Sequence, residues 1–256
     1  MIGLGFSCLL ALSLVRRIMS TIAANLQAVR KRIEAACRAC GRDPGSVLLV
    51  AVSKTFSGAA ISEAALAGQR DFGENYAKEG AEKIHALPDA ALRWHYIGPV
   101  QSNKTRMIAG HFDWVHTIER ERIAARLSQA RDPARTPLQV CIQVNVSGEA
   151  SKSGVSPEQA AALAERVASL PHLKLRGLMT IPEPTRDPSL ARRRYARLRE
   201  LGCELKRAGF ALDTLSMGMS ADFEAAIAEG ATLVRVGTAI FGERPAGARL
   251  PGEDAE

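Results

Sequence analysis

The chain has 256 residues, of which 46% are hydrophobic and 24% charged, a composition typical of a globular protein large enough for one α/β domain. Its formal net charge of +7 raises the question of a nucleic-acid or membrane partner. No basic run is interleaved with aromatic residues, and no nucleic-acid-binding motif appears. We therefore expect neither nucleic acid nor a membrane among the partners.

Residues 1–18 do not fit the pattern of the rest of the chain. The apolar part of this segment is too short to cross a membrane comfortably. It also lacks the basic residues that precede the apolar core of a signal peptide, and it has no clear cleavage site. We interpret residues 1–18 as an upstream extension with Met19 as the working start, followed by one domain over 19–246 and a tail over 247–256.

From Ser20 onward, apolar residues recur at helical spacing and predict a first helix that Gly41 ends. Beyond it, apolar runs that predict strands alternate with amphipathic stretches that predict helices. The expected strands cover residues 47–55, 71–75, 92–97, 113–118, 138–146, 173–180, 212–216 and 232–236. The expected helices cover residues 59–67, 76–87, a short stretch ending at 109, 119–129, 157–170, 189–208 and 221–229.

Regular alternation of strands and helices indicates right-handed βαβ units and a parallel sheet. Eight such units in about 250 residues are typical of a (β/α)₈ TIM barrel. An open, doubly wound sheet is the alternative, because the number of strands alone does not close a barrel.

The first predicted strand carries the most informative residue. It is an apolar, β-branched run that ends with Lys54, at the position where α/β folds place their chemistry. A partly desolvated lysine has a lowered pKa and can form a Schiff base with a carbonyl compound. The simpler alternative is that Lys54 extends from the strand end into water.

Polar residues and glycines also follow the last two predicted strands. Ser216 and Gly218 lead into a predicted helix, while Gly237 and Thr238 come soon after Arg235. Loops at these positions of a barrel often bind phosphate, and glycine allows the backbone to approach the ligand closely. A lysine amine, a phosphate site and a strand-end arginine together suggest pyridoxal 5′-phosphate as the cofactor.

The order of several longer motifs resembles one known family, the pyridoxal phosphate homeostasis proteins, which are similar to the isolated barrel domain of alanine racemase. The resemblance covers about residues 19–244. It is carried by Val52-Ser53-Lys54, Phe72-Gly73-Glu74-Asn75, the run from Trp94 to Lys104, Ser151-Lys152-Ser153-Gly154, the run from Leu178 to Pro182, the run from Leu215 to Phe223, and the run from Val234 to Gly242.

The resemblance implies a role for each matching residue. Lys54 would carry the Schiff base, and Asn75 would lie near the ring of the cofactor. Arg235 would face the pyridine nitrogen and keep it unprotonated, which makes the ring a weak electron sink. The phosphate would be held by Ser216, Gly237 and Thr238, with Gly218 beside them.

Two functions remain open from the sequence. The first is a binder that holds pyridoxal 5′-phosphate, maintains its level and passes it to apo-enzymes, with no catalytic residues of its own. The second is a racemase, which needs a second base opposite the lysine. All three tyrosines, Tyr76, Tyr96 and Tyr195, fall within the barrel, and no second domain is expected to supply that base, so we favour the binder. We further expect a monomer.

Histidines and cysteines give weaker signals. His95 lies on a predicted strand, and we interpret it as a hydrogen-bonded structural group. The five histidines show no ligand spacing, so we predict no metal site. Cys37 and Cys40 have C-x-x-C spacing, but they end a predicted helix and no second pair exists. Scattered cysteines indicate a reducing compartment, and we expect a cytoplasmic protein.

Overall fold

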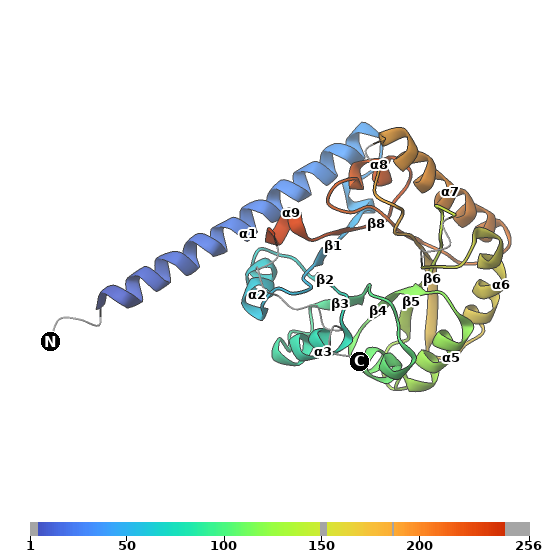
Figure 1. Cartoon of the computed structure of the whole chain (residues 1–256), viewed down its shortest axis with the longest axis horizontal. Helices are drawn as coiled ribbons and strands as arrows, with labels where there is room; N and C mark the ends of the chain where they lie inside the picture. Colours follow the sequence, from blue (N-terminus) through green and yellow to red (C-terminus); the bar gives the residue numbers. More distant parts are fainter. Residues whose placement is uncertain (1–4, 149–152, 186, 244–256) are drawn as a thin grey trace.

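The structure, a computed structural model, describes the backbone of residues 5–148, 153–185 and 187–243, with side chains from residue 21 onward. Eight parallel strands form a ring surrounded by helices (Figure 1). The ring is closed, because β1 pairs with β8 as well as with β2. The predicted (β/α)₈ barrel is thus confirmed, and the open sheet is excluded. The predicted tail over 247–256 and the motif residues Ser151 and Lys152 lie outside the described residues.

The strands follow the predicted order and are shorter than predicted at their ends. They are β1 (Leu48–Val52), β2 (Asp71–Glu74), β3 (Arg93–Tyr96), β4 (Trp114–Ile118), β5 (Leu138–Gln143), β6 (Leu173–Met179), β7 (Thr214–Ser216) and β8 (Leu233–Val236). The helices are α1 (Gly5–Ala39), α2 (Gly58–Leu66), α3 (Ala77–Ala86), α4 (Thr105–His111), α5 (Glu121–Ala130), α6 (Pro157–Ala168), α7 (Pro188–Arg207), α8 (Phe223–Ala228) and α9 (Thr238–Phe241). Helix α9 was not predicted, because four residues are too few to show helical periodicity.

Helix α1 begins at Gly5, so the prediction of a start at Ser20 was wrong. After Gly5 the segment contains neither glycine nor proline, and its leucines and alanines favour helix, so nothing in the sequence interrupts it. Its contacts with the barrel are made by a stripe of buried residues, Ile22, Leu26, Val29 and Ile33. That part packs against α2, α8 and α9, whereas the N-terminal part projects away from the barrel (Figure 1). Within the described residues, no helix is long and apolar enough to span a bilayer.

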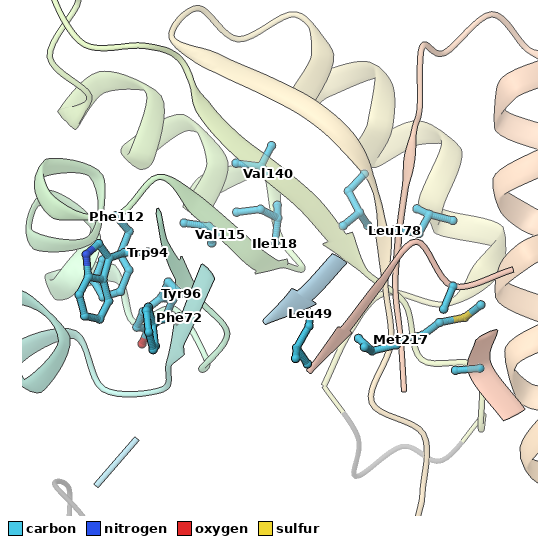
Figure 2. Packing of buried hydrophobic residues seen from close by; sticks show 14 of the residues in the cluster. Leu49, Phe72, Trp94, Tyr96, Phe112, Val115, Ile118, Val140, Leu178 and Met217 are labelled. Atoms are coloured by element: carbon cyan, nitrogen blue, oxygen red, sulfur yellow. The ribbon is translucent and has the colours of Figure 1, made fainter. Parts of the chain in front are cut away.

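The main hydrophobic core lies between the sheet and the helices. Figure 2 shows a group of aromatic residues on β2, on β3 and just after α4. Phe72 packs against Trp94 and Tyr96 against Phe112, with ring centroids 5.7 Å and 5.3 Å apart, respectively. Such pairs add to the free energy gained by burial. Of the strands that carry the candidate site, this packing supports β2.

A second, smaller cluster consists of Trp114, Cys141 and Met179. Trp114 stacks on the imidazole of His95, with ring centroids 5.4 Å apart. His95 and Trp114 are also paired across β3 and β4, so their side chains lie on the same face of the sheet. Polar groups therefore share the barrel interior with apolar ones.

Candidate functional site

The seven residues predicted to bind the cofactor lie on four neighbouring strands, in the order β7, β8, β1 and β2. All of them lie at the carboxyl ends of these strands or in the loops that follow. In barrels of this kind the carboxyl ends meet at one face, where ligands bind. These residues are Ser216 and Gly218 from β7, Arg235, Gly237 and Thr238 from β8, Lys54 from β1 and Asn75 from β2.

Lys54 comes two residues after the end of β1, and its side chain is half-buried. The chain turns sharply there, because the next residue, Thr55, has a φ of 68°. A positive φ is uncommon for a β-branched residue and persists only when the surroundings enforce it. The orientation of Lys54 is therefore set by contacts of the neighbouring backbone.

Asn75 directly follows β2 and is half-buried. Its Oδ1 atom is buried and has no hydrogen-bond partner within the protein. Such an atom costs free energy unless a ligand or water satisfies it. The backbone of Asn75 is in close contact with Gly98, where an added Cβ would overlap the Asn75 carbonyl group. The tight contact fixes where the unsatisfied amide oxygen lies.

Arg235 is 3% exposed and lies at the centre of a buried group of hydrogen bonds. Its Nη1 donates to Ser216 Oγ at 2.6 Å, and its Nη2 donates to the carbonyl oxygen of Thr180 at 2.9 Å. Ser216 Oγ also lies 2.8 Å from Nδ1 of His116. Since His116 is on β4 and Ser216 on β7, strands that are not neighbours, this contact crosses the barrel interior.

The hydrogen bonds continue from His116 to the other end of the barrel. Nε2 of His116 lies 2.9 Å from Nδ1 of His95, whose Nε2 lies 3.0 Å from Asp71. Arg93 binds the two carboxylate oxygens of Asp71 through Nε and Nη2, each at 2.7 Å. We name the groups Arg93, Asp71, His95, His116, Ser216 and Arg235 the interior chain.

Electrostatics shift the pKa of two members of the interior chain, His116 and Asp71. Burial, with smaller contributions from His95 and Arg235, holds the pKa of His116 well below its usual value, so its ring is neutral. Burial would raise the pKa of Asp71, but hydrogen bonds from His95 and Arg93 hold it below the usual value. The interpretation of His95 as a structural, hydrogen-bonded group agrees with this geometry. The interior chain could not be predicted from the sequence, because the residues that form it are far apart along the polypeptide.

Two glycines allow the loops at the site to pack closely. Gly218 has a φ of 95°, and a Cβ there would lie 2.6 Å from Cβ of Ala226. A Cβ on Gly237 would lie 3.1 Å from the carbonyl oxygen of Val52 on β1. Thr238, the first residue of α9, is exposed. Glycine is thus required where the loops after β7 and β8 approach their neighbours.

The chemistry of these groups suits a phosphorylated aldehyde with an aromatic ring. The site offers an amine at Lys54, a guanidinium at Arg235 and an unsatisfied amide oxygen at Asn75, with glycine-containing loops after β7 and β8. Across the described residues, no three His, Cys, Asp or Glu side chains converge as metal ligands would. The absence of a metal from the functional protein remains a prediction.

A family model described as "Alanine racemase, N-terminal domain" matches residues 24–245. The chain is 59% identical over 230 residues to the pyridoxal phosphate homeostasis protein of Pseudomonas aeruginosa, covering 90% of this chain and 99% of the relative. The chain belongs to the family of pyridoxal phosphate homeostasis proteins. The homeostasis protein of Escherichia coli is 51% identical over 236 residues, which cover 88% of this chain and 98% of that one.

Solved structures agree with this membership. The structure of PipY of Synechococcus elongatus with PLP bound is 36% identical to this chain and has a TM-score of 0.74. The match covers 86% of this chain and 100% of the PipY chain. Alanine racemase of Corynebacterium glutamicum has a TM-score of 0.68, with 91% of this chain and 63% of that one covered. At 17% identity it shows a shared barrel fold alone.

Proposed function

We propose that this protein binds pyridoxal 5′-phosphate covalently through Lys54 and maintains its supply, without turning over a substrate. One observation carries the proposal: Lys54 follows β1, the strand that pairs with β8 on one side and β2 on the other. Lys54 therefore follows the strand that lies between those that carry Arg235 and Asn75. The names of the homologues, and the bound PLP in PipY, support the choice of this ligand.

When bound, the cofactor supplies an aldehyde, which condenses with a primary amine to form a C=N bond and release one water molecule. Lys54 is the amine at the centre of the site. Arg235 lies on the neighbouring strand and bears a fixed positive charge, so it disfavours a proton on a pyridine nitrogen beside it. The unsatisfied Oδ1 of Asn75 can accept a hydrogen bond from the ligand.

The phosphate is assigned to the loops after β7 and β8, with Gly218, Gly237 and Thr238. The sequence also suggested Ser216 as a phosphate ligand. Its hydroxyl group is fully buried and already accepts a hydrogen bond from Arg235. We therefore assign Ser216 to the orientation of Arg235.

Two of the three tyrosines of the barrel, Tyr96 and Tyr195, are engaged in hydrogen bonds that support binding without turnover. Tyr96 donates its hydroxyl proton to the carbonyl oxygen of Pro99, and burial raises its pKa to about 12. Tyr195 donates to Asp222, and burial, with that carboxylate, raises its pKa far above neutral pH. Neither can serve as a base at neutral pH. We further propose a cytoplasmic monomer whose recipients are apo-enzymes that require the cofactor.

The deciding experiment measures attachment of the cofactor. Purified protein is incubated with pyridoxal 5′-phosphate, reduced with borohydride and digested, and the modified peptide is identified by mass spectrometry. We expect the protein to be yellow before reduction and labelled at Lys54 after it. The label should be lost in Lys54→Ala and normal in Lys78→Ala, whose side chain is exposed on α3. A protein that takes up no cofactor would overturn the proposal.

A second measurement separates the binder from the racemase. The loaded protein is incubated with L-alanine in D₂O, and deuterium at the α-carbon and D-alanine are both followed. We expect no D-alanine, together with transfer of the cofactor to an apo-enzyme that requires it. D-alanine that forms with the wild type and not with Lys54→Ala would restore the racemase.

A further inference from the structure

A buried ion cluster lies directly beneath the turn that carries Lys54. It consists of Glu74 at the end of β2 and of Glu79 and Lys83 on α3. Lys83 is 8% exposed, and its Nζ lies 2.8 Å from Glu74 Oε1 and 2.6 Å from Glu79 Oε1. A buried lysine with two carboxylate partners is unusual, since burial of charge is costly unless geometry is good. We name these three residues the lysine clamp.

The clamp holds the peptide groups on both sides of Lys54. Lys83 Nζ donates to the carbonyl oxygen of Ser53 at 2.8 Å, and that carbonyl belongs to the peptide group before Lys54. The backbone N–H of Thr55, in the peptide group after Lys54, donates to Glu79 Oε1 at 2.6 Å. One ion pair of α3 therefore fixes the backbone on either side of a single residue.

The local backbone explains why such a clamp is needed. Thr55 has a φ of 68°, a conformation that is strained for a β-branched residue. The charge-assisted bond from its N–H to Glu79 opposes relaxation of this strain. Ser53 is also held through its side chain, because its Oγ donates to Glu74 Oε1 at 2.7 Å.

Glu74 is the least satisfied member of the clamp. It is fully buried, and its Oε2 has no hydrogen-bond partner within the protein. Burial raises its pKa, and the neighbouring Lys83 opposes this shift. A carboxyl group in such surroundings costs stability, so stability alone does not account for the clamp.

We propose that Glu79 and Lys83 are positioning residues, which aim the amine of Lys54 at the aldehyde of the cofactor, while Glu74 holds Lys83 in place. This inference rests on the proposed function, because it concerns attachment at Lys54. Neither residue is expected to touch the cofactor. The clamp governs the rate of C=N bond formation and leaves non-covalent recognition of the ligand to the loops after β7 and β8.

The test separates recognition from attachment. Pyridoxine 5′-phosphate has an alcohol where the cofactor has an aldehyde, so it reports non-covalent affinity alone. Attachment of pyridoxal 5′-phosphate is followed by stopped-flow absorbance across a range of pH. Glu79→Gln is compared with Glu82→Gln, and Lys83→Met with Lys78→Met, because Glu82 and Lys78 are exposed on the same helix.

We expect both clamp variants to slow attachment by about tenfold or more, since a small displacement of a reacting group can cost up to about a hundredfold. Their affinity for pyridoxine 5′-phosphate should stay within about twofold of the wild type, because recognition lies elsewhere. The pH profile of attachment should shift in Glu79→Gln and not in Glu82→Gln. Wild-type attachment rates and pH profiles in Glu79→Gln would overturn the inference.

Two further arms make the outcome unambiguous. Lys83→Met leaves the buried carboxylate of Glu74 without its cation, which can prevent folding. The double variant Glu74→Gln/Lys83→Met removes that unpaired charge, and we again expect slow attachment. Should both fail to fold, Glu79→Gln decides alone, because Glu79 is partly exposed and its substitution removes the negative charge that holds Lys83 and the N–H of Thr55. A wild type that binds neither ligand would refute the proposed function itself, whereas equal rates in all variants would refute only the clamp.

Discussion

A 2.6 Å hydrogen bond joins the guanidinium group of Arg235 to the hydroxyl oxygen of Ser216 inside the barrel. Both side chains are buried, and Ser216 also contacts His116. The direction of the Arg235 side chain therefore depends on a residue of another strand. The phosphate contact that the resemblance implied for Ser216 stays a prediction, beside our proposal that Ser216 orients Arg235.

Substitution of Ser216 by alanine tests this role. An N–H of Arg235 would lose its acceptor, so we expect the free energy of unfolding to fall by about 1–3 kcal/mol. The absorbance spectrum of the bound cofactor should change, while competition by inorganic phosphate should not. Thr238→Val is the matched variant, in which phosphate competition should weaken. Equal loss of phosphate affinity in both variants would return Ser216 to the phosphate site.

The buried histidine predicts a dependence of stability on pH. The pKa of His116 is held well below its usual 6.5 by burial, so unfolding at low pH takes up a proton. Its contribution to stability is fully present above about pH 6.5 and is lost as the pH falls, by up to about 1.4 kcal/mol per pH unit. The free energy of unfolding is measured with urea at several pH values between 8 and 5. It should fall less steeply with decreasing pH in His116→Gln than in His85→Gln, whose side chain is exposed. Identical slopes would contradict the assignment.

Gly98 is predicted to be intolerant of even a methyl group. An added Cβ would overlap the carbonyl group of Asn75, and the backbone after β2 would have to move. We expect Gly98→Ala to lower stability by about 1–3 kcal/mol and to weaken cofactor binding. Gly110→Ala is the control, because a Cβ there meets no atom within 4 Å, and it should be neutral or stabilising. Unchanged binding in Gly98→Ala would show that the backbone of Asn75 can shift without consequence.

Deletion of residues 1–18 is predicted to leave folding and cofactor uptake intact. Among the side chains of α1 that the structure describes, the first buried one is that of Ile22. Burial raises the pKa of Glu63 on α2, and hydrogen bonds from the backbone N–H groups of Ala23 and Ile22 partly offset this shift. These N–H groups would belong to the first turn of the helix left after deletion, so the Glu63 carboxyl group would cap its start.

Glu63→Gln should therefore cost about 0.5–2 kcal/mol in the shortened protein, as loss of a helix cap does, and less in the full chain. Thermal unfolding and cofactor uptake are compared for the full chain and the shortened protein, each with and without Glu63→Gln. Loss of folded protein on deletion would show that the N-terminal part of α1 is required.

The sequence was sufficient to predict the barrel, because each strand and helix is encoded locally by its own apolar pattern. Lys54 and Arg235 could be predicted as candidate site residues for the same reason: each is a charged residue at or near the end of an apolar run. The start of α1 at Gly5 was not predicted. The expected start at Ser20 was taken from the apolar pattern that packs on the barrel, and no helix-breaking residue shows that the helix extends beyond this pattern.

Contacts between distant residues could not be predicted in this way. Ser216 and His116 are 100 residues apart, and only the closure of the barrel brings them together. Lys83 lies within the predicted helix over 76–87, where nothing in the sequence sets it apart from other charged residues. Its burial depends on how α3 packs against β2, which no spacing rule encodes. A buried ion pair of this kind becomes visible only when the distances are known.

The interior chain meets water at Arg93. The Arg93 side chain is 55% exposed, at the start of β3, and so at the end of the barrel opposite Lys54. The hydrogen bonds that orient Arg235 thus reach a side chain that is exposed to solvent at the opposite end of the barrel. A change of charge at Arg93 would act first on Asp71 and then, through the two histidines, on the groups that hold Arg235. A substitution at this surface position is therefore expected to be felt at the candidate site, although Arg93 lies far from it.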